Sequence, residues 1–167
     1  MKRTILSLLS MILWGISCIQ AQDIFSANDL DPANVTETKT FGAFNITARN
    51  DKNVTIEVLE VPREAPDGEI FNNRIKLNGA GSTDYRSLSF SIDQKRDLII
   101  YCNSSSKTDA RILVLYDVKN GKTIAELNAD PDNGTKAAVI MTSLSSAGTY
   151  TLYSKSGGIN IYQIMLK

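Results

Sequence analysis

The chain has 167 residues, with 18 Lys plus Arg, 18 Asp plus Glu and no His. This length suits one globular domain that buries its own core. The balanced charge argues against a general polyanion binder, and we expect no nucleic-acid partner. The lack of His excludes Ser/His/Asp and Cys/His nucleophilic pairs, His-ligated zinc and the usual proton shuttle of neutral pH. Composition therefore argues against most familiar enzymes, though not against all, and we expect a protein that is not an enzyme.

Residues 1–21 have the form of a secretory signal peptide. Lys2 and Arg3 precede an apolar stretch at residues 5–14, and small residues lead to Ala21. The apolar stretch is shorter than the roughly 20 residues that span a bilayer. The sequence thus predicts cleavage after Ala21 and a secreted or periplasmic protein with no membrane span.

A lipid anchor at Cys18 is the alternative. The tripeptide Ile16-Ser17-Cys18 looks like part of a bacterial lipobox, but Gly15 stands where Leu or Val is usual. Lipid attachment would make the chain a surface lipoprotein. With either cut, Cys102 is the one internal Cys and has no disulfide partner, so we expect it to be a small buried residue.

After the signal, short segments rich in β-branched and aromatic residues alternate with turn residues, which is typical of an all-β fold. Alternation is clearest at residues 86–92, where Leu88, Phe90 and Ile92 share one face. Residues 22–34 are expected to be a flexible lead-in to a domain at 35–167. The predicted strands are residues 41–48, 53–60, 69–77, 86–93, 97–102, 110–117, 122–128, 136–142, 149–154 and 159–166.

The turns favour an antiparallel arrangement. Asn120-Gly121 is the strongest hairpin signal, since a type I′ turn needs positive φ at both central residues. Ten short strands in so small a chain predict an antiparallel two-sheet β-sandwich of jelly-roll kind, with a closed barrel as the alternative.

Alternating strand directions would place every second connection at the same end of the sandwich. One end then collects residues 49–52, 78–85, 103–109, 129–135 and 155–158. These connections include Gly79-Ala80-Gly81-Ser82, Asn103-Ser104-Ser105-Ser106 and Ser156-Gly157-Gly158. We expect these small polar loops to form one pole of the molecule that carries the site, although Gly and Ser are also ordinary turn formers.

Four cations lie near those loops, namely Arg74, Lys76, Arg86 and Arg111, and Tyr85 is the Tyr expected to be exposed. Arginine grips carboxylates in bidentate fashion, so the cluster fits the uronic acids of an acidic polysaccharide. A tyrosine ring can stack on the apolar face of a sugar. The alternative is that the cations pair internally with the nearby acids Asp84, Asp109 and Asp117.

No cofactor is expected. Residues 130–134, Asp-Pro-Asp-Asn-Gly, offer oxygen ligands for a structural calcium ion, but the later bidentate Glu of an EF-hand loop is missing. We interpret the segment as a turn.

The ordered motifs of residues 74–162 resemble the β-sandwich modules of secreted pectate lyases and other polysaccharide-degrading proteins of Bacteroides relatives. The likeness covers about residues 35–167. It differs in that no lyase or hydrolase domain is present and Cys102 replaces a small residue. The motifs are Arg74-x-Lys76-x-x-Gly79-x-Gly81-Ser82, Arg86-x-x-Ser89-Phe90, Tyr101-x-x-Ser104-Ser105-Ser106, Asp109-x-Arg111 and Gly157-Gly158-Ile159-Asn160-Ile161-Tyr162.

The resemblance implies a non-catalytic module that binds plant or host polysaccharide, such as pectin. The expected ligand-binding residues are Arg74, Lys76, Tyr85, Arg86, Ser104, Ser105, Arg111 and Asn160. Two rivals remain: a structural or protein-interaction module that meets other surface proteins, and a calcium-dependent lyase with Lys or Arg as base. The lyase would need a carboxylate cluster in a cleft, which the spacing of acids does not provide.

Overall fold

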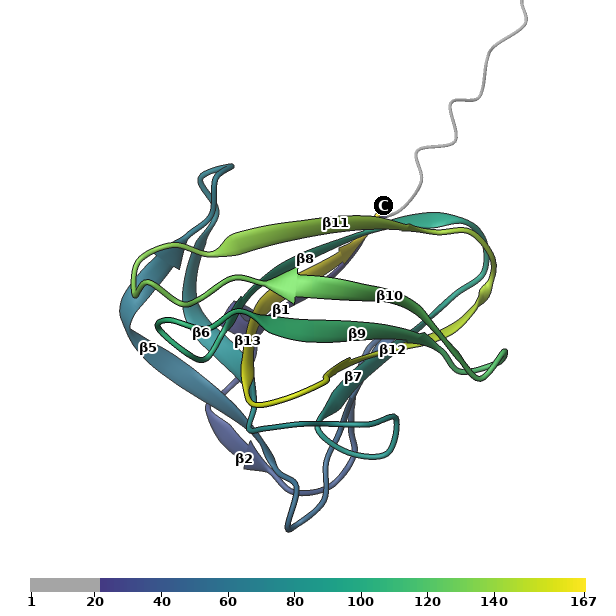
Figure 1. Cartoon of the computed structure of the whole chain (residues 1–167), viewed down its shortest axis with the longest axis horizontal. Coiled ribbons are helices and arrows are strands. Elements are labelled where there is room, and N and C mark those ends of the chain that lie inside the picture. Colours follow the sequence, from purple (N-terminus) through teal and green to yellow (C-terminus); the bar gives the residue numbers. More distant parts are fainter. Residues whose placement is uncertain (1–21) are drawn as a thin grey trace, which may run out of the picture.

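A computed structural model describes residues 22–167. The predicted signal peptide and Cys18 lie outside these residues. The described chain is built of β-strands and one short 3-10 helix, η1 (Ala27–Asp29) (Figure 1). The strands are β1 (Asp23–Ser26), β2 (Ala33–Val35), β3 (Lys39–Phe41), β4 (Phe44–Thr47), β5 (Val54–Glu64), β6 (Ile70–Leu77), β7 (Ser87–Ile92), β8 (Arg96–Ser104), β9 (Arg111–Asp117), β10 (Lys122–Ala129), β11 (Ala138–Leu144), β12 (Gly148–Ser154) and β13 (Ile159–Leu166).

The strands form two antiparallel sheets that pack face to face. The seven-stranded sheet has the order β11-β8-β13-β6-β5-β2, with β1 also paired to β13, and the six-stranded sheet has the order β10-β9-β12-β7-β4-β3. Consecutive strands are neighbours in the pairs β5–β6, β9–β10 and β3–β4, whereas other neighbours, such as β8 and β13, come from distant parts of the chain, as expected for a jelly-roll-like sandwich. The predicted fold class is confirmed, and each of the ten predicted segments overlaps a strand.

The main core lies between the sheets. Leu88 and Phe90 of β7 are buried in it, as their alternation with serines predicts. The seven-stranded sheet is also covered on its outer face. On β8, Leu98 and Ile100 belong to the main core, whereas Ile99 and Tyr101 belong to a second apolar cluster. This double burial explains the continuous apolar run of β8, since both faces of the strand meet protein.

The second cluster is covered by the outer part of the β5–β6 hairpin. The backbone N–H of Glu64 donates to the carbonyl oxygen of Thr135 at 3.0 Å, and that of Ala137 donates to the carbonyl oxygen of Glu64 at 3.0 Å. The phenol of Tyr101 donates to Asp67 at 2.6 Å at the hairpin tip. These contacts hold residues 59–71 against the loop between β10 and β11 and create the walls of a groove.

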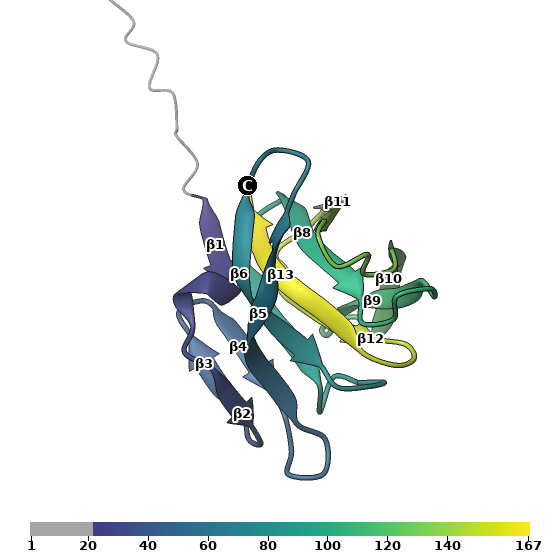
Figure 2. The same cartoon turned by 90° about the vertical axis from the view of Figure 1, so that its left-hand side faces the viewer.

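Two expectations are corrected. Residues 22–34 are part of the sandwich and not a loose lead-in, because β1 pairs with the C-terminal half of β13 and is a strand of the folded body (Figure 2). Phe25 of β1 also packs in the core. The hairpin at Asn120-Gly121 exists, but its turn is not type I′, because Gly121 has positive φ and Asn120 does not. Asp117 explains the difference, since its carboxylate accepts hydrogen bonds from the backbone and side-chain nitrogens of Asn120 and so closes a longer turn.

Candidate functional site

The serine and glycine loops meet at one pole, as predicted. Arg111 at the start of β9 donates through Nη1 to Ser105 Oγ at 2.7 Å and to the carbonyl oxygen of Gly158 at 2.5 Å. The backbone N–H of Ser105 also donates to that carbonyl oxygen at 3.0 Å. Arg111 therefore ties two loops together, and its guanidinium is directed at protein groups.

The glycines of the β6–β7 loop make room for Arg86. A Cβ at Gly79 would lie 2.7 Å from Arg86 Nη1, and one at Gly81 would lie 2.5 Å from the carbonyl oxygen of Arg86. Arg86 has a φ of 48°, a left-handed conformation that is unusual for a residue other than Gly. Its Nε donates to the carbonyl oxygen of Asn53 at 3.3 Å. The Gly-x-Gly-Ser motif thus accommodates an arginine and its strained backbone.

Tyr85 is half-buried beside two cations. The guanidinium carbon of Arg49 lies 5.5 Å from the centre of the Tyr85 ring, and Lys52 Nζ lies 6.0 Å from it. These are cation–π distances. The protein's own cations therefore lie against the Tyr85 ring, which limits the surface on which a sugar could stack.

Arg74, Lys76 and Asn160 lie on the outer face of the seven-stranded sheet. Arg74 of β6 donates to Glu57 of β5 through Nε at 2.9 Å and Nη2 at 2.6 Å. Lys76 lies 3.9 Å from the same carboxylate. Asn160 is buried, and its Nδ2 donates to Asp132 at 3.2 Å. The predicted set is therefore divided between the loop pole and this sheet face.

The internal partners proposed from the sequence are wrong. Asp109 accepts hydrogen bonds from Ser106 and Thr108, and Asp117 accepts from Asn120. Asp84 accepts from Thr83. The acid that pairs with Arg74 and Lys76 is Glu57, which lies directly opposite Arg74 across the β5–β6 pair. Sequence distance was a poor guide because the strand register, and not the number of intervening residues, sets which side chains meet.

Ser104 is also fully buried, and its Oγ accepts a hydrogen bond from the backbone N–H of Ser106 at 3.1 Å. Ser104 and Asn160 are thus buried side chains that bond to neighbouring residues, Ser104 to the backbone of Ser106 and Asn160 to Asp132. Among the predicted residues, Arg74 is the one that lines an open groove on the outer face of the seven-stranded sheet.

That groove has a volume of about 670 Å³. Glu57 and Arg74 come from the sheet itself, Lys107 from the serine loop and Gly134 from the β10–β11 loop. The outer part of β5 supplies an apolar wall with two exposed valines. The lining residues are Glu57, Val58, Leu59, Glu60, Val61, Arg63, Arg74, Lys107 and Gly134.

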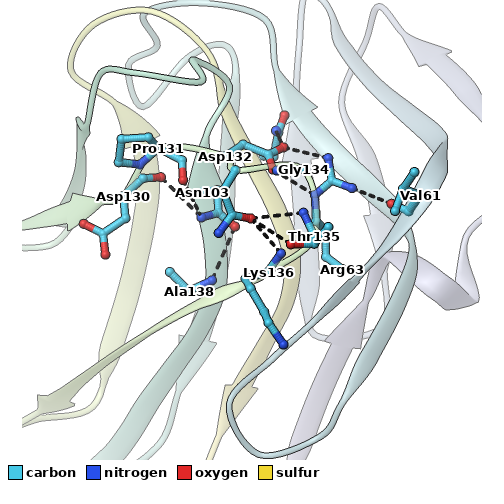
Figure 3. Close-up of polar contacts among 12 residues, drawn as sticks. Val61, Arg63, Asn103, Asp130, Pro131, Asp132, Gly134, Thr135, Lys136 and Ala138 are labelled. Carbon is cyan, nitrogen blue, oxygen red and sulfur yellow. Dashed lines mark hydrogen bonds and ion pairs between the residues drawn. The ribbon is translucent and has the colours of Figure 1, made fainter.

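A buried ion pair supports one side of the groove. Arg63 Nε lies 2.8 Å from Asp132 Oδ1 and Nη2 lies 3.0 Å from Oδ2, a bidentate geometry (Figure 3). Arg63 Nη1 also donates to the carbonyl oxygen of Val61, and the backbone N–H of Gly134 donates to Asp132 Oδ1 at 2.9 Å. The central carboxylate of the Asp-Pro-Asp-Asn-Gly turn is thus held by an arginine, as suits a structural turn.

The carboxylates of Glu57 and Asp132 have lowered pKa values and are therefore in their charged form at neutral pH. Burial alone would raise the pKa of Glu57, but hydrogen bonds from Arg74 and Thr55 outweigh it and lower the pKa. Burial would also raise the pKa of Asp132, but hydrogen bonds from Arg63 and from the backbone N–H of Gly134 outweigh this effect. The pKa of Asp132 is therefore lowered as well. A carboxyl group with a lowered pKa is a hydrogen-bond acceptor and a poor general acid.

Sequence reasoning missed Glu57, Arg63, Lys107 and Asp132 as members of one site. Glu57 had a signal, because it occupies an outward position of a predicted strand, directly opposite Arg74. Arg63 had none, since it lies on the part of β5 that follows the register shift between Val58 and Arg63. Within residues 22–167, no group of three or more His, Cys, Asp or Glu side chains is placed to hold a metal ion.

Cys102 is buried in the main core, as predicted. Burial, with a smaller effect of Asp130, raises the pKa of its thiol to about 12. Residues 22–167 contain no helix that is long and apolar enough to cross a membrane.

The chain resembles solved β-sandwich structures at low sequence identity. The K1 cleaved adhesin domain of Lys-gingipain from Porphyromonas gingivalis aligns over 89% of this chain and 98% of that chain, with 10% identity and a TM-score of 0.54. A family 35 carbohydrate-binding module from Clostridium thermocellum aligns over 88% of this chain and 98% of that one, with 13% identity and a TM-score of 0.48. The C-terminal CBM6 of the laminarinase LamC from Zobellia galactanivorans aligns over 88% and 99%, with 16% identity and a TM-score of 0.46.

No protein-family model matches the chain. No curated protein matches it either. At 10% identity, the likeness to the adhesin domain shows a shared fold.

Proposed function

We propose that this chain is a non-catalytic exported module that binds polysaccharide in the groove on the outer face of the seven-stranded sheet. The observation that carries the proposal is the mixture of chemistries in one open groove of about 670 Å³. Glu57 and Arg74 offer an acceptor and donors side by side on its floor, and valines of β5 form an apolar wall.

A sugar ring needs this combination. Its hydroxyl groups both donate and accept hydrogen bonds, so a carboxylate and a guanidinium held together can engage one sugar at adjacent positions. Its C–H face packs on apolar side chains, and Val58 and Val61 are 63% and 51% exposed. The pairing of Arg74 with Glu57 preorganises both side chains, which reduces the entropic cost of binding.

Uronic-acid-containing chains such as pectin are the first class to test. Arg63 and Arg74 are each paired with an acid, whereas Lys107 is exposed at the rim, where its ammonium can meet a carboxylate of the ligand. Tyr85 and Arg86 at the loop pole extend the proposed surface. Arg111 and the buried Ser104 and Asn160 act through the loops and side chains that they position.

Affinity gel electrophoresis against polygalacturonate and neutral glucans tests the proposal. We expect retardation by at least one glycan. Arg74→Gln and Lys107→Ala should each weaken binding about tenfold, as loss of about one charge-assisted hydrogen bond implies. Lys155→Ala is the matched control, because Lys155 pairs with Glu126 of the other sheet and lies outside the groove. Absence of retardation on every glycan, or retardation that ignores Arg74 and Lys107, would overturn the proposal.

A second candidate is a protein-interaction module of a cell-surface assembly. The observation in its favour is the exposure of large apolar side chains, with Met141 70% exposed and Ile70 54% exposed. Co-sedimentation with whole cells stripped of surface polysaccharide separates the two functions, because a glycan-binding module would lose its target and a protein-binding module would keep it.

A further inference from the structure

Within the described chain, four strands end the two main sheet paths, and three of these four have features that discourage pairing with another chain. The sheet orders place β11 and β2 at the edges of the seven-stranded sheet and β10 and β3 at the edges of the six-stranded sheet. Strands β2 and β3 have three residues each. Strand β10 carries Lys122 and Glu126 and has a register shift between Thr123 and Ala125. Short length, charge and bulges are the usual protections of a sheet edge.

Strand β11 lacks these protections. Its seven residues, Ala138–Leu144, include no charged residue and no Pro. It pairs with β8 in a register without shifts, and within the described chain its other edge has no strand partner. Met141 at its centre is 70% exposed, the most exposed of the large apolar side chains in the described part. A long, regular and uncharged edge strand is a template for strand addition.

The surroundings of Met141 fit a second copy of the same strand. Met141 is paired with Ile99 and Val139 with Tyr101, so these side chains share the outer face of the sheet. A hollow of about 300 Å³ lies beside them, lined by Pro66, Asp67, Ile99, Tyr101, Val139, Met141 and Lys167. An exposed methionine next to an apolar hollow is complementary to its own copy under a two-fold axis.

We propose that two copies of this chain pair through β11, antiparallel and centred on Met141, so that the seven-stranded sheets join into one. In this register Met141 meets Met141 of the second copy, Ile140 meets Thr142 and Val139 meets Ser143. No charged residue opposes another within the strand. The charged groups nearest the strand have partners within their own copy, because Lys136 pairs with Glu64 at 3.0 Å and Asp97 accepts a hydrogen bond from Ser143 at 2.6 Å.

Pairing in this way has a consequence for binding. Residues directly opposite each other in an antiparallel pair project to the same face, so the outer faces of both seven-stranded sheets would point in one direction. Under the proposed function, the two grooves would then face the same polymer. Two linked sites raise avidity without any new contact. The dimer itself does not depend on what the groove binds.

Sedimentation velocity on the chain, with lipidation excluded by Cys18→Ser, tests the proposal. The chain with its native β11 sequence should form a concentration-dependent dimer. Met141→Lys and Met141→Glu should each be monomeric, with at least tenfold weaker self-association, because the axis places like charges opposite each other. A mixture of the two variants should recover a dimer, since Lys then faces Glu. Circular dichroism checks that each variant is folded.

Val118→Lys is the matched control, because Val118 is an exposed apolar residue of the β9–β10 turn and should leave the dimer intact. A native chain that remains monomeric throughout the accessible concentration range would overturn the proposal. So would a dimer that persists in both Met141 variants, or a mixture that stays monomeric. Glycan binding is measured separately, so failure of the dimer and failure of the proposed function are distinguishable.

Discussion

Arg63 and Asp132 are 69 residues apart in the chain and form a bidentate ion pair whose side chains are 10% and 8% exposed. The pair joins the outer part of β5 to the loop between β10 and β11, on the outer face of the seven-stranded sheet. The two backbone hydrogen bonds of Glu64 run beside it. The pair therefore fixes the β5 wall of the groove to the loop between β10 and β11.

Replacing one partner should be costly. Asp132→Ala leaves the Arg63 guanidinium buried without its counter-ion, and we expect the free energy of unfolding to fall by about 3–5 kcal/mol. Glu64→Ala is the control, because its pair with Lys136 is exposed and contributes about 1 kcal/mol or less. Urea unfolding followed by circular dichroism measures both. Equal losses in the two variants would show that the buried pair has no special role.

Stability should decrease in acid. The pKa values of Asp132 and Glu57 are lowered from ordinary values of 3.8 and 4.5, so their charged forms are favoured in the folded state. This contribution is complete above the ordinary values and is lost as pH falls through the lowered ones. Urea unfolding between about pH 2 and pH 7 should show the decline below about pH 4.5. The Asp132→Ala variant should show a shallower decline, and a stability that rises in acid would contradict the assignment.

Because the loops approach closely at the pole, a side chain at Gly158 should destabilise the fold. A Cβ there would lie 2.6 Å from Ser105 Oγ and 2.9 Å from the carbonyl oxygen of Leu77. We expect Gly158→Ala to cost about 1–3 kcal/mol through overpacking. Gly148→Ala is matched, since its Cβ would meet Tyr150 at 3.7 Å, an ordinary contact. In thermal unfolding, the midpoint of Gly158→Ala should lie well below that of Gly148→Ala. Similar midpoints would argue against tight loop packing.

Tyr101 should titrate abnormally. Burial and the hydrogen bond to Asp67 raise its pKa to about 12. Asp67→Asn removes the charged acceptor, so the pKa of Tyr101 should fall toward its ordinary value while burial keeps it above that value. Ultraviolet absorbance of tyrosinate against pH measures the change, with the exposed loop residue Asp51→Asn as control. A Tyr101 that titrates identically in the Asp67 variant would show that the contact is not maintained in solution.

Much of the fold was predictable because it rests on short-range physics. The alternation of Leu88, Phe90 and Ile92 with serines identified a strand and its buried face. The meeting of the serine and glycine loops was also predictable, since antiparallel strands joined by short turns send every second connection to the same end. The lead-in was mispredicted, because β1 is paired with β13, at the opposite end of the chain.

The candidate site was predictable only in part. Arg74 was named from its residue type, yet its partner Glu57 is set by strand register. Arg63 and Asp132 meet because β5 changes register after Val58 and continues over the outer face of the sheet, and no local pattern encodes that path.

The sequence by itself determined the strands, their buried faces and the end at which the loops gather, since each depends on side-chain alternation and turn chemistry within a few residues. Only the tertiary structure decided which charges pair, which face is grooved and which edge is left open. These depend on contacts between residues far apart in the chain, where a shift of one residue in register brings different side chains together.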